Sequence, residues 1–271
     1  MSLHAAHDLL RCPHCAADLT ADGPRWRCPA GHSFDVAKQG YLNLANGPEP
    51  ANADTPAMLE ARARVQASGL FDVVSEALDQ QVPLTGATTL LEAGAGTGHY
   101  LAGLVEGRPG ARGLALDVSR AAARRASRAH HRVASVVADV WRGLPVRTAS
   151  LDVVLCVFAP RNLAEFARVL RPDGTLLIAT PTAGHLAELR ERYGLLGIDD
   201  DKHDRLLAAA SEYFAHEHTA VAKSLTSQVA AAVVDDLIGM GPNAFHNPPR
   251  AAGAETVRLA VRVSRFTPLA A

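Results

Sequence analysis

Three of the four cysteines in this 271-residue chain lie within its first 28 positions, at spacings suited to binding a metal. Cys12 and Cys15 are separated by two residues, and a second pair, Cys28 and His32, follows further along. Zinc takes four thiolate or imidazole ligands at tetrahedral corners, and two close pairs on opposing turns supply them. The pattern predicts a structural zinc site in which protein fills every position.

His14 lies inside the first cysteine pair and competes with His32 for the fourth position. We favour His32 because it completes the second pair. The alternative is that the three thiols are free and bind no metal. A region this small has little core of its own, so zinc would supply much of its folding free energy.

A second set of residues suits a small-molecule cofactor. Glu92 is followed by three alternating glycines, Gly94, Gly96 and Gly98. Such glycines let a ligand approach the backbone closely. Their spacing differs from that of dinucleotide sites. It resembles motif I of S-adenosylmethionine-dependent methyltransferases, in which the acid faces the amino-acid end of the cofactor.

Two further acids lie where strands are expected to end. Asp117 comes about 20 residues after the last glycine, a position suited to accepting hydrogen bonds from ribose hydroxyls. Asp139 follows the next apolar run, where the resemblance puts an acid near the adenine amino group. The alternative is an ordinary glycine turn with two surface acids that cap helices.

These residues need a parallel sheet to bring them together. After Pro83, short apolar strands alternate with helical segments, which indicates an α/β fold with crossover helices. We expect strands at 89–92, 113–117, 134–138, 151–158 and 175–180, with helices at 98–106, 120–129 and 163–170. Two late strands at 219–225 and 256–266, flanking a helix at 228–240, would close the sheet edge. Before the sheet, helices are expected from Thr55 and over 71–81.

The expected organisation has three parts. Residues 1–45 form a zinc-ribbon-like module, residues 46–84 a linker with helices, and residues 85–271 a Rossmann-like class I methyltransferase domain. The formal net charge of −1 excludes a polycation that coats nucleic acid by bulk charge alone. We find no signal peptide and no run long enough to span a membrane, so a cytoplasmic protein is expected.

The two signatures together resemble one family closely. The segment from Phe34 to Leu44, with the cysteine pairs before it and the methyltransferase pattern after it, is similar to the RlmA family. The motifs at 138–141, 158–162, 185–189 and 240–242 add to the resemblance, which covers nearly the whole chain. It implies methylation of guanine N1 in a hairpin loop of 23S rRNA in the large ribosomal subunit. Among its branches the chain is most similar to the TlrB-like one, which confers macrolide resistance.

The resemblance also implies roles for particular residues. The cofactor loop extends through Gly98 to His99, and His185 matches a histidine that touches the cofactor. Phe71 stands where the family usually has a tyrosine that closes over the cofactor. On sequence alone, His185 is equally compatible with an exposed helix start, and Phe71 with plain core. The family also suggests a homodimer.

On the substrate side the sequence leaves alternatives open. Phe158, Trp141 and Phe245 are candidates to stack on the target base, although core packing is the commoner use of such residues. Trp26 and Tyr41 are candidates to stack on RNA from the zinc module. Seven arginines between positions 120 and 147 form either an RNA footprint or a solvated helix face.

No residue stands out as the acceptor of the guanine N1 proton. Asp204, His246 and the Pro160 carbonyl are all possible, as is solvent. Two other functions fit the same motifs. One is a small-molecule methyltransferase that retains the zinc module, and the other is a non-catalytic ribosome-binding or assembly protein. The intact acids and glycines disfavour the second of these, and the intact zinc segment disfavours the first.

Overall fold

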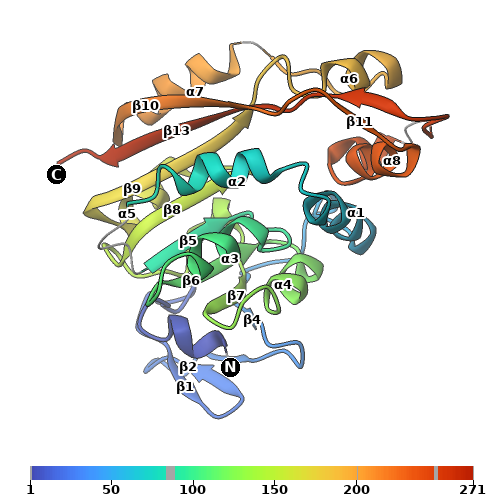
Figure 1. The fold of residues 1–271 in the computed structure, drawn as a ribbon. Coiled ribbons are helices and arrows are strands. Elements are labelled where there is room, and N and C mark those ends of the chain that lie inside the picture. Colours follow the sequence, from blue (N-terminus) through green and yellow to red (C-terminus); the bar gives the residue numbers. More distant parts are fainter. Residues whose placement is uncertain (1, 84–88, 200, 247–249, 271) are drawn as a thin grey trace.

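A central eight-stranded sheet organises the chain (Figure 1). The computed structural model describes residues 2–83, 89–199, 201–246 and 250–270. The strand order is β10-β13-β9-β8-β5-β6-β7-β4, with parallel pairing from β4 to β9 and antiparallel pairing of β13 with β9 and β10. The strands are β4 (Leu42–Asn43), β5 (Thr89–Ala93), β6 (Arg112–Asp117), β7 (Val133–Val137), β8 (Leu151–Val157), β9 (Leu170–Pro181), β10 (Phe214–Lys223) and β13 (Ala260–Pro268). This is the expected α/β class I methyltransferase fold.

The five predicted parallel strands are all present, and most of their ends differ from the prediction by a residue or two. The exception is β9, which begins at Leu170, directly after the preceding helix, and not at Thr175. The C-terminal prediction needs a larger correction. The run 256–266 is interrupted, so that β12 (Glu255–Val257) pairs with β11 (Ser227–Val229) in a separate two-stranded sheet. The helix expected over 228–240 is accordingly shorter, and β10 starts five residues before the predicted strand.

Helices cover both faces of the central sheet. They are α1 (Pro56–Ala67), α2 (Asp72–Asp79), α3 (His99–Glu106), α4 (Arg120–Ala126), α5 (Leu163–Val169), α6 (Ala187–Tyr193), α7 (Lys202–Ala210) and α8 (Ala231–Gly239), with 3₁₀ turns η1 (Ser2–Ala6), η2 (Val140–Arg142) and η3 (Pro242–His246). The predicted start of α1 is confirmed. The Thr55 hydroxyl caps the helix by accepting from the Met58 amide, and Pro56 occupies the first turn.

Alternate side chains of each strand pack into two different cores, because successive residues of a strand point to opposite faces. Leu91 lies in the core shared with α5, α7 and the N-terminal segment. Its neighbour Leu90 lies in the core shared with α1, α2, α3, α6 and α8. Strands buried on both faces explain the continuous apolar runs that revealed them in the sequence.

The N-terminal module is a three-stranded antiparallel sheet made of β1 (Thr20–Asp22), β2 (Arg25–Arg27) and β3 (Ser33–Asp35). It is joined to the rest of the chain through β4, which pairs in parallel with β7 at the edge of the central sheet. Its apolar side chains, such as Leu10 and Trp26, belong to the same core as Val136 of β7. The boundary expected at 84/85 lies outside the described residues.

Candidate functional site

The structure brings the four predicted zinc ligands together. One donor atom from each of Cys12, Cys15, Cys28 and His32 lies within 4.8 Å of the other three. The Cys12 and Cys28 sulfurs are 3.5 and 3.3 Å from His32 Nδ1, and the Cys15 and Cys28 sulfurs are 3.6 Å apart. A tetrahedron with zinc–sulfur bonds of about 2.3 Å has edges of about 3.8 Å. The donor set therefore fits a zinc ion in both chemistry and size.

Two tight turns aim these ligands at one point. In the first, the Ala16 amide donates to the Cys12 carbonyl, and in the second the Gly31 amide donates to the Cys28 carbonyl. His14 lies outside the cluster, with its ring stacked on Phe34 at a centroid distance of 5.8 Å. Burial opposes ionisation of Cys28, but its hydrogen bonds with His32 and Cys15 lower the pKa of this thiol to about 6. A thiolate is the form that binds zinc.

The glycine loop connects β5 to α3 at the carboxyl edge of the sheet. Gly94, Gly96 and Gly98 all have positive φ values, between +52° and +76°. Gly94 is also crowded, because a Cβ atom at this position would lie 2.4 Å from the Cβ of Ala159. A side chain there would push apart the ends of β5 and β8. Gly96 and Gly98 are crowded as well, by the Arg62 guanidinium and by Ala126 and Ala129. Backbone conformation and space both require glycine in this loop, as in turns that bring backbone close to a nucleoside cofactor.

Two of the three predicted acids are buried beneath or beside this loop. Glu92 is 1% exposed, and its Oε2 accepts from the Leu101 amide of α3. Burial raises its pKa to about 8, against the opposing effect of that hydrogen bond. Asp117 accepts from the Gly96 amide through one oxygen and from the Ser119 amide through the other, at 2.8 and 2.9 Å. Burial raises the pKa of Asp117 as well.

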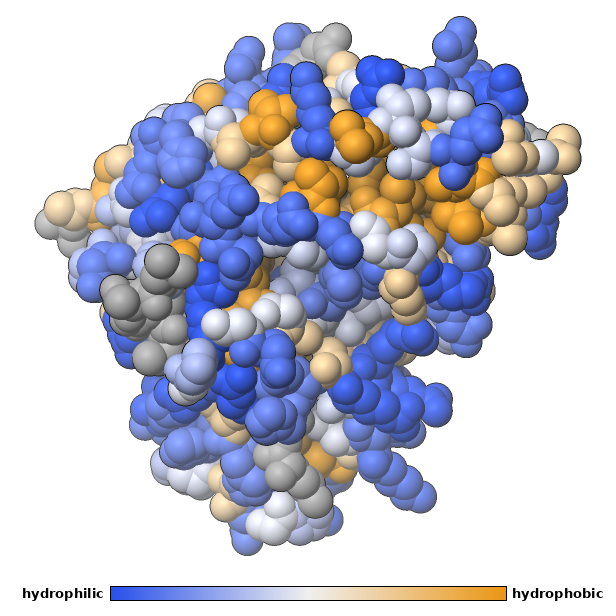
Figure 2. Space-filling model, viewed as in Figure 1, coloured by the Kyte–Doolittle hydropathy of each residue, from blue (hydrophilic) through white to orange (hydrophobic). Residues whose placement is uncertain are grey.

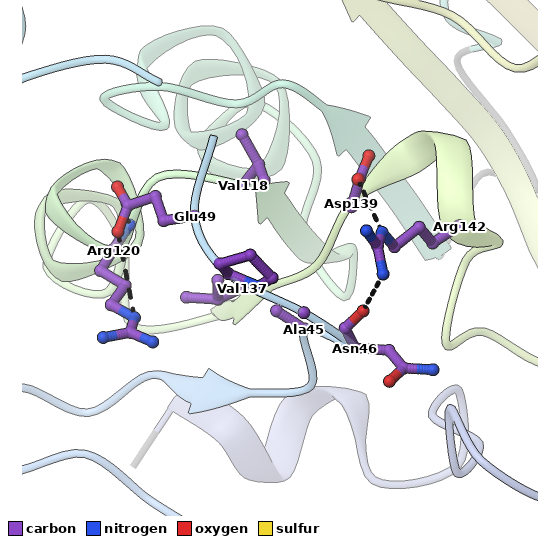
Figure 3. Close-up of a pocket in the computed structure, with 10 residues that line it drawn as sticks. Ala45, Asn46, Glu49, Val118, Arg120, Val137, Asp139 and Arg142 are labelled. Atoms are coloured by element: carbon purple, nitrogen blue, oxygen red, sulfur yellow. Dashed lines mark hydrogen bonds and ion pairs between the residues drawn. The ribbon is translucent and has the colours of Figure 1, made fainter. Parts of the chain in front are cut away.

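Asp139 lies at the end of β7 and lines a pocket with a segment of the linker (Figure 3). Residues 45–49 cross the carboxyl ends of β6 and β7 here, and we name them the strap. The Asp139 carboxylate accepts from the Trp141 amide and pairs with Arg142, whose Nη1 donates to the Asn46 carbonyl. At the other end of the strap, Glu49 accepts from the Arg120 amide. The pocket between them is therefore walled by the linker, which the sequence prediction had treated only as a connection.

Three aromatic rings meet beside the loop. Phe71, Phe158 and His185 have centroid separations of 5.9 to 6.4 Å. Phe71 is buried and lies at the start of α2. His185 is largely buried, and this burial lowers its pKa to about 4. His99 lies at the start of α3, within 3.5 Å of the Ser75 hydroxyl, and burial lowers its pKa too.

The solvent exposure of four aromatic residues contradicts the prediction made for each. Core packing is the commoner expectation for three of them, and RNA stacking is the expectation for the fourth. Trp141, Phe158 and Phe245 are 65%, 42% and 44% exposed, so none of them is a core residue. Trp26 is 2% exposed and packs in the core, so it cannot stack on RNA in this conformation. Phe158 also has φ of +54°, which is uncommon for a bulky residue and is typical of functional sites.

Comparison with known proteins identifies the chain. Residues 10–45 match the N-terminal family model of RlmA, and residues 91–178 match a methyltransferase domain. A putative 23S rRNA (guanine-N1)-methyltransferase of Micromonospora griseorubida is 42% identical over 96% of this chain and 97% of its own length. The 23S rRNA (guanine(748)-N1)-methyltransferase of Streptomyces fradiae is 43% identical over 89% and 87%. The chain belongs to the 23S rRNA (guanine-N1)-methyltransferase family.

Solved structures support the fold alone. A chain from the complex of the Haloferax volcanii Trm112 methyltransferase activator with a putative methyltransferase matches with a TM-score of 0.53 at 15% identity. That match covers 78% of this chain and 94% of the other. Membership of the family confirms the predicted resemblance and its cofactors, S-adenosylmethionine and zinc. The residues that hold each of them remain predictions.

Sequence reasoning missed one basic residue of the site. Arg62 of α1 reaches the glycine loop, where its Nη1 lies 2.6 Å from the position of a Cβ on Gly96. It lies on a helix far from the glycine motif in sequence, and the helical pattern alone gives no sign of where the side chain ends.

No membrane-spanning helix is present among the residues described.

Proposed function

We propose that the chain transfers a methyl group from S-adenosylmethionine to N1 of a guanosine in a hairpin loop of 23S rRNA. The target we favour is the nucleotide equivalent to position 748, the guanine that the S. fradiae relative is named for. The observation that carries the proposal is the high identity over both modules, combined with a glycine loop and acids at the ends of adjacent strands. Since the proposed substrate is rRNA, we expect the enzyme to act in the cytoplasm, on the large ribosomal subunit or its RNA.

The proposed cofactor contacts follow from where each residue lies. Zinc would be held by Cys12, Cys15, Cys28 and His32. S-adenosylmethionine would lie along Gly94, Gly96, Gly98 and His99, with Asp117 facing the ribose and Asp139 the adenine. Phe71 and His185 would pack over it, and Glu92 would hold the first turn of α3, which follows the loop, through the Leu101 amide. When bound, the cofactor supplies a methyl group on a positively charged sulfur, and that charge disappears as the methyl group leaves.

Phe158 is suited to hold the target base. Its ring is solvent-exposed at the end of β8 and faces His185 at 5.9 Å with an interplanar angle of 33°. A base extruded from its hairpin loop would stack on this ring, and stacking would orient N1 toward the methyl group. Contacts of the Phe158 ring with Phe71 and His185 would orient the ring before the base arrives. Such pre-orientation lowers the entropic barrier to transfer.

Guanine N1 must lose its proton as the new bond to the methyl carbon forms. The Ala159 and Pro160 carbonyls share the single Cys156 thiol hydrogen, at 3.4 and 3.5 Å, and a neutral backbone carbonyl is too weak a base to keep the guanine proton. Asp204 is exposed on α7, and His246 is exposed at the end of η3. Among the residues described, neither side chain makes a hydrogen bond or ion pair with the glycine loop. We therefore assign the proton to solvent.

The exposed face of α4 is our proposed contact for the RNA backbone. Arg120, Arg124 and Arg125 are exposed on this helix, and Arg128 is exposed in the turn that follows it. The helix is anchored to the N-terminal segment at both ends, because the Ser127 hydroxyl donates to the Gln39 carbonyl and the Arg120 amide donates to Glu49. The arginines thus line a path from the zinc module to the strap. Backbone phosphates would be neutralised along that path.

The decisive experiment is methyl transfer from labelled cofactor to large-subunit RNA, followed by nucleoside analysis. Label in 1-methylguanosine is expected, in a single hairpin and lost when its guanosine is replaced by adenosine. Label in a small molecule but not in RNA would favour the small-molecule alternative, and cofactor binding without any transfer would favour the ribosome-binding one. Macrolide resistance is tested by expressing the chain in a sensitive host. Protection should require an intact target guanosine.

We also propose that the chain acts as a homodimer. Hydrophobic side chains gather on the face shown in Figure 2, over the region between α2 and the C-terminal strands. A groove on the molecule is lined there by Leu70, Val229 and Val233, among others. A second copy is the partner we favour for this apolar surface. Light scattering of the purified chain should give twice the mass of 28.6 kDa, and a monomeric mass would refute the dimer.

A further inference from the structure

The guanidinium of Arg62 joins three separate segments at the glycine loop. Its Nη1 donates to Asp54 at 2.5 Å, and its Nη2 donates to the Met240 carbonyl at 2.6 Å. The same Nη1 would be 2.6 Å from a Cβ on Gly96. Figure 1 shows α1 lying beside both α4 and α8, and Met240 caps the end of α8, so the Arg62 side chain can reach that segment. The guanidinium therefore lies on the surface along which the cofactor is expected to bind.

The surroundings of Arg62 are acidic. Burial raises the pKa of both Glu92 and Asp117. The positive charge of Arg62 opposes this rise and offsets part of it. Asp54 is a third acid, in direct contact with the guanidinium. The Arg62 side chain is 24% exposed, so its charge is only partly screened by water. The guanidinium thus pairs with Asp54 directly and opposes the effect of burial on the other two acids.

The cofactor carries two positive groups, the sulfonium and the ammonium, and one negative group, the carboxylate. The acids suit the positive groups, whereas the carboxylate needs a donor. A guanidinium is the side chain best shaped to bind a carboxylate, through two parallel hydrogen bonds. We propose that Arg62 binds the carboxylate at the amino-acid end of S-adenosylmethionine. This inference rests on the cofactor part of the proposed function and not on the RNA substrate.

The competing explanation is purely structural, with Arg62 holding Asp54 to the end of α8. Two nucleosides separate the explanations. S-adenosylhomocysteine carries the carboxylate, whereas 5′-methylthioadenosine lacks the whole amino-acid end. Calorimetric titration of Arg62→Met should show S-adenosylhomocysteine binding weakened by about 10- to 100-fold, the loss expected for hydrogen bonds to a charged group. Binding of 5′-methylthioadenosine should be unchanged, and Arg62→Lys should be intermediate.

Arg64→Met is the matched control. Arg64 lies on the same helix and pairs with Asp236 of α8 through two hydrogen bonds of 2.6 and 2.8 Å, but its side chain is 61% exposed. The Arg64→Met variant should bind both nucleosides with the same affinity as the unaltered chain. Thermal unfolding of each variant establishes that it is folded before titration.

If Arg62→Met binds both nucleosides more weakly by the same factor, the proposal is overturned in favour of the structural role. Unchanged affinity for both nucleosides would also overturn it. Failure of the RNA assay is a distinct result. A chain that binds S-adenosylhomocysteine through Arg62 but labels no RNA would leave this inference standing and remove the rRNA substrate.

Discussion

The Nδ1 atom of His185 accepts a hydrogen bond from the backbone amide of Ala260, at 3.3 Å. A backbone amide can only donate, so Nδ1 carries no proton and the neutral ring holds its proton on Nε2. The contact crosses from the turn after β9 to the first residue of β13. The position and the tautomer of this predicted cofactor-binding residue are therefore set by the C-terminal strand, which is inserted next to β9.

This relationship predicts a pH dependence of stability. The pKa of His185 is lowered from 6.5 to about 4, so the unfolded chain binds a proton at a pH where the folded chain does not. The contribution of this group to the free energy of unfolding is fully present above pH 6.5 and is lost as the pH falls toward 4. Between pH 7.5 and pH 5 the loss should be about 2 kcal/mol.

Urea unfolding at the two pH values measures this loss. In His185→Gln that part of the acid destabilisation should be absent, whereas the exposed His218 on β10 offers a control in which His218→Gln behaves as the unaltered chain. If His185→Gln loses as much stability on acidification as the unaltered chain does, the ring is not held in its neutral form by the fold.

The crowding at Gly94 gives a second prediction. Gly94→Ala should destabilise the chain twice over, through its φ of +73° and through the contact with Ala159. Left-handed backbone costs a residue with a Cβ about 1–2 kcal/mol, and overpacking adds about 1–3 kcal/mol. Gly110 has φ of +87° and nothing within 4 Å of an added Cβ, so Gly110→Ala shows the backbone cost alone.

Denaturant unfolding and S-adenosylhomocysteine titration of the two variants make the comparison. Gly94→Ala should be the less stable and should lose cofactor affinity, while Gly110→Ala keeps it. Equal stability and equal affinity in the two variants would show that the ends of β5 and β8 separate freely at this point.

Much of this architecture was predictable because its signals are local. Buried parallel strands give continuous apolar runs, and the paired cysteines and alternating glycines are each contained in a short segment. The prediction failed where packing between distant segments decides. Trp26 has an aromatic side chain of the kind that stacks on RNA, but it is buried in a core that includes residues of β7. Phe158 lies in an apolar run of the sequence, yet it is exposed.

The C-terminal strands show a second limit. The alternation of apolar and polar residues over 256–266 predicts extended chain, and most of this run is indeed strand. Nothing in the alternation marks the break at 258–259 that divides β12 from β13. That break lets the Arg258 and Ala260 backbones bond to the turn that carries His185. Arg62 and the strap were likewise invisible in the sequence, since their contacts join α1 and the linker to the sheet edge.

The shared core of the zinc module leads to a third prediction. Cys12 and Cys28 lie in the same core as Leu114 and Val136 of the central sheet, and β4 follows the module directly. Removing zinc should therefore destabilise the whole chain, by more than about 4 kcal/mol, and not the N-terminal segment alone. The strap should loosen as well, because it continues from β4, and S-adenosylhomocysteine should bind more weakly.

Chelation and Cys28→Ser each test this prediction, with metal content measured in parallel. Hydrogen exchange should speed up in β7 as well as in the module, and adding zinc back should restore the chelated chain but not the variant. Exchange that rises only before residue 40, with unchanged affinity for S-adenosylhomocysteine, would mean that the two parts are energetically independent.

The arginine face of α4 gives the last prediction, on RNA affinity. Arg124 and Arg125 of α4 and Arg128 in the turn after it are exposed between the zinc module and the strap, and reversing their charge would repel the RNA backbone. Each lost phosphate contact should reduce the slope of log affinity against log salt concentration by about 0.7 to 0.9. The triple charge reversal should thus weaken binding to the 23S hairpin and flatten its salt dependence, without changing the affinity for S-adenosylhomocysteine.

Lys223→Glu is the control, because Lys223 lies on β10 at the opposite edge of the sheet, where no RNA path is proposed. It should leave the RNA affinity and its salt dependence unchanged. A salt slope that stays the same in the triple variant would show that this face is only solvated, and that the RNA approaches the cofactor from another side.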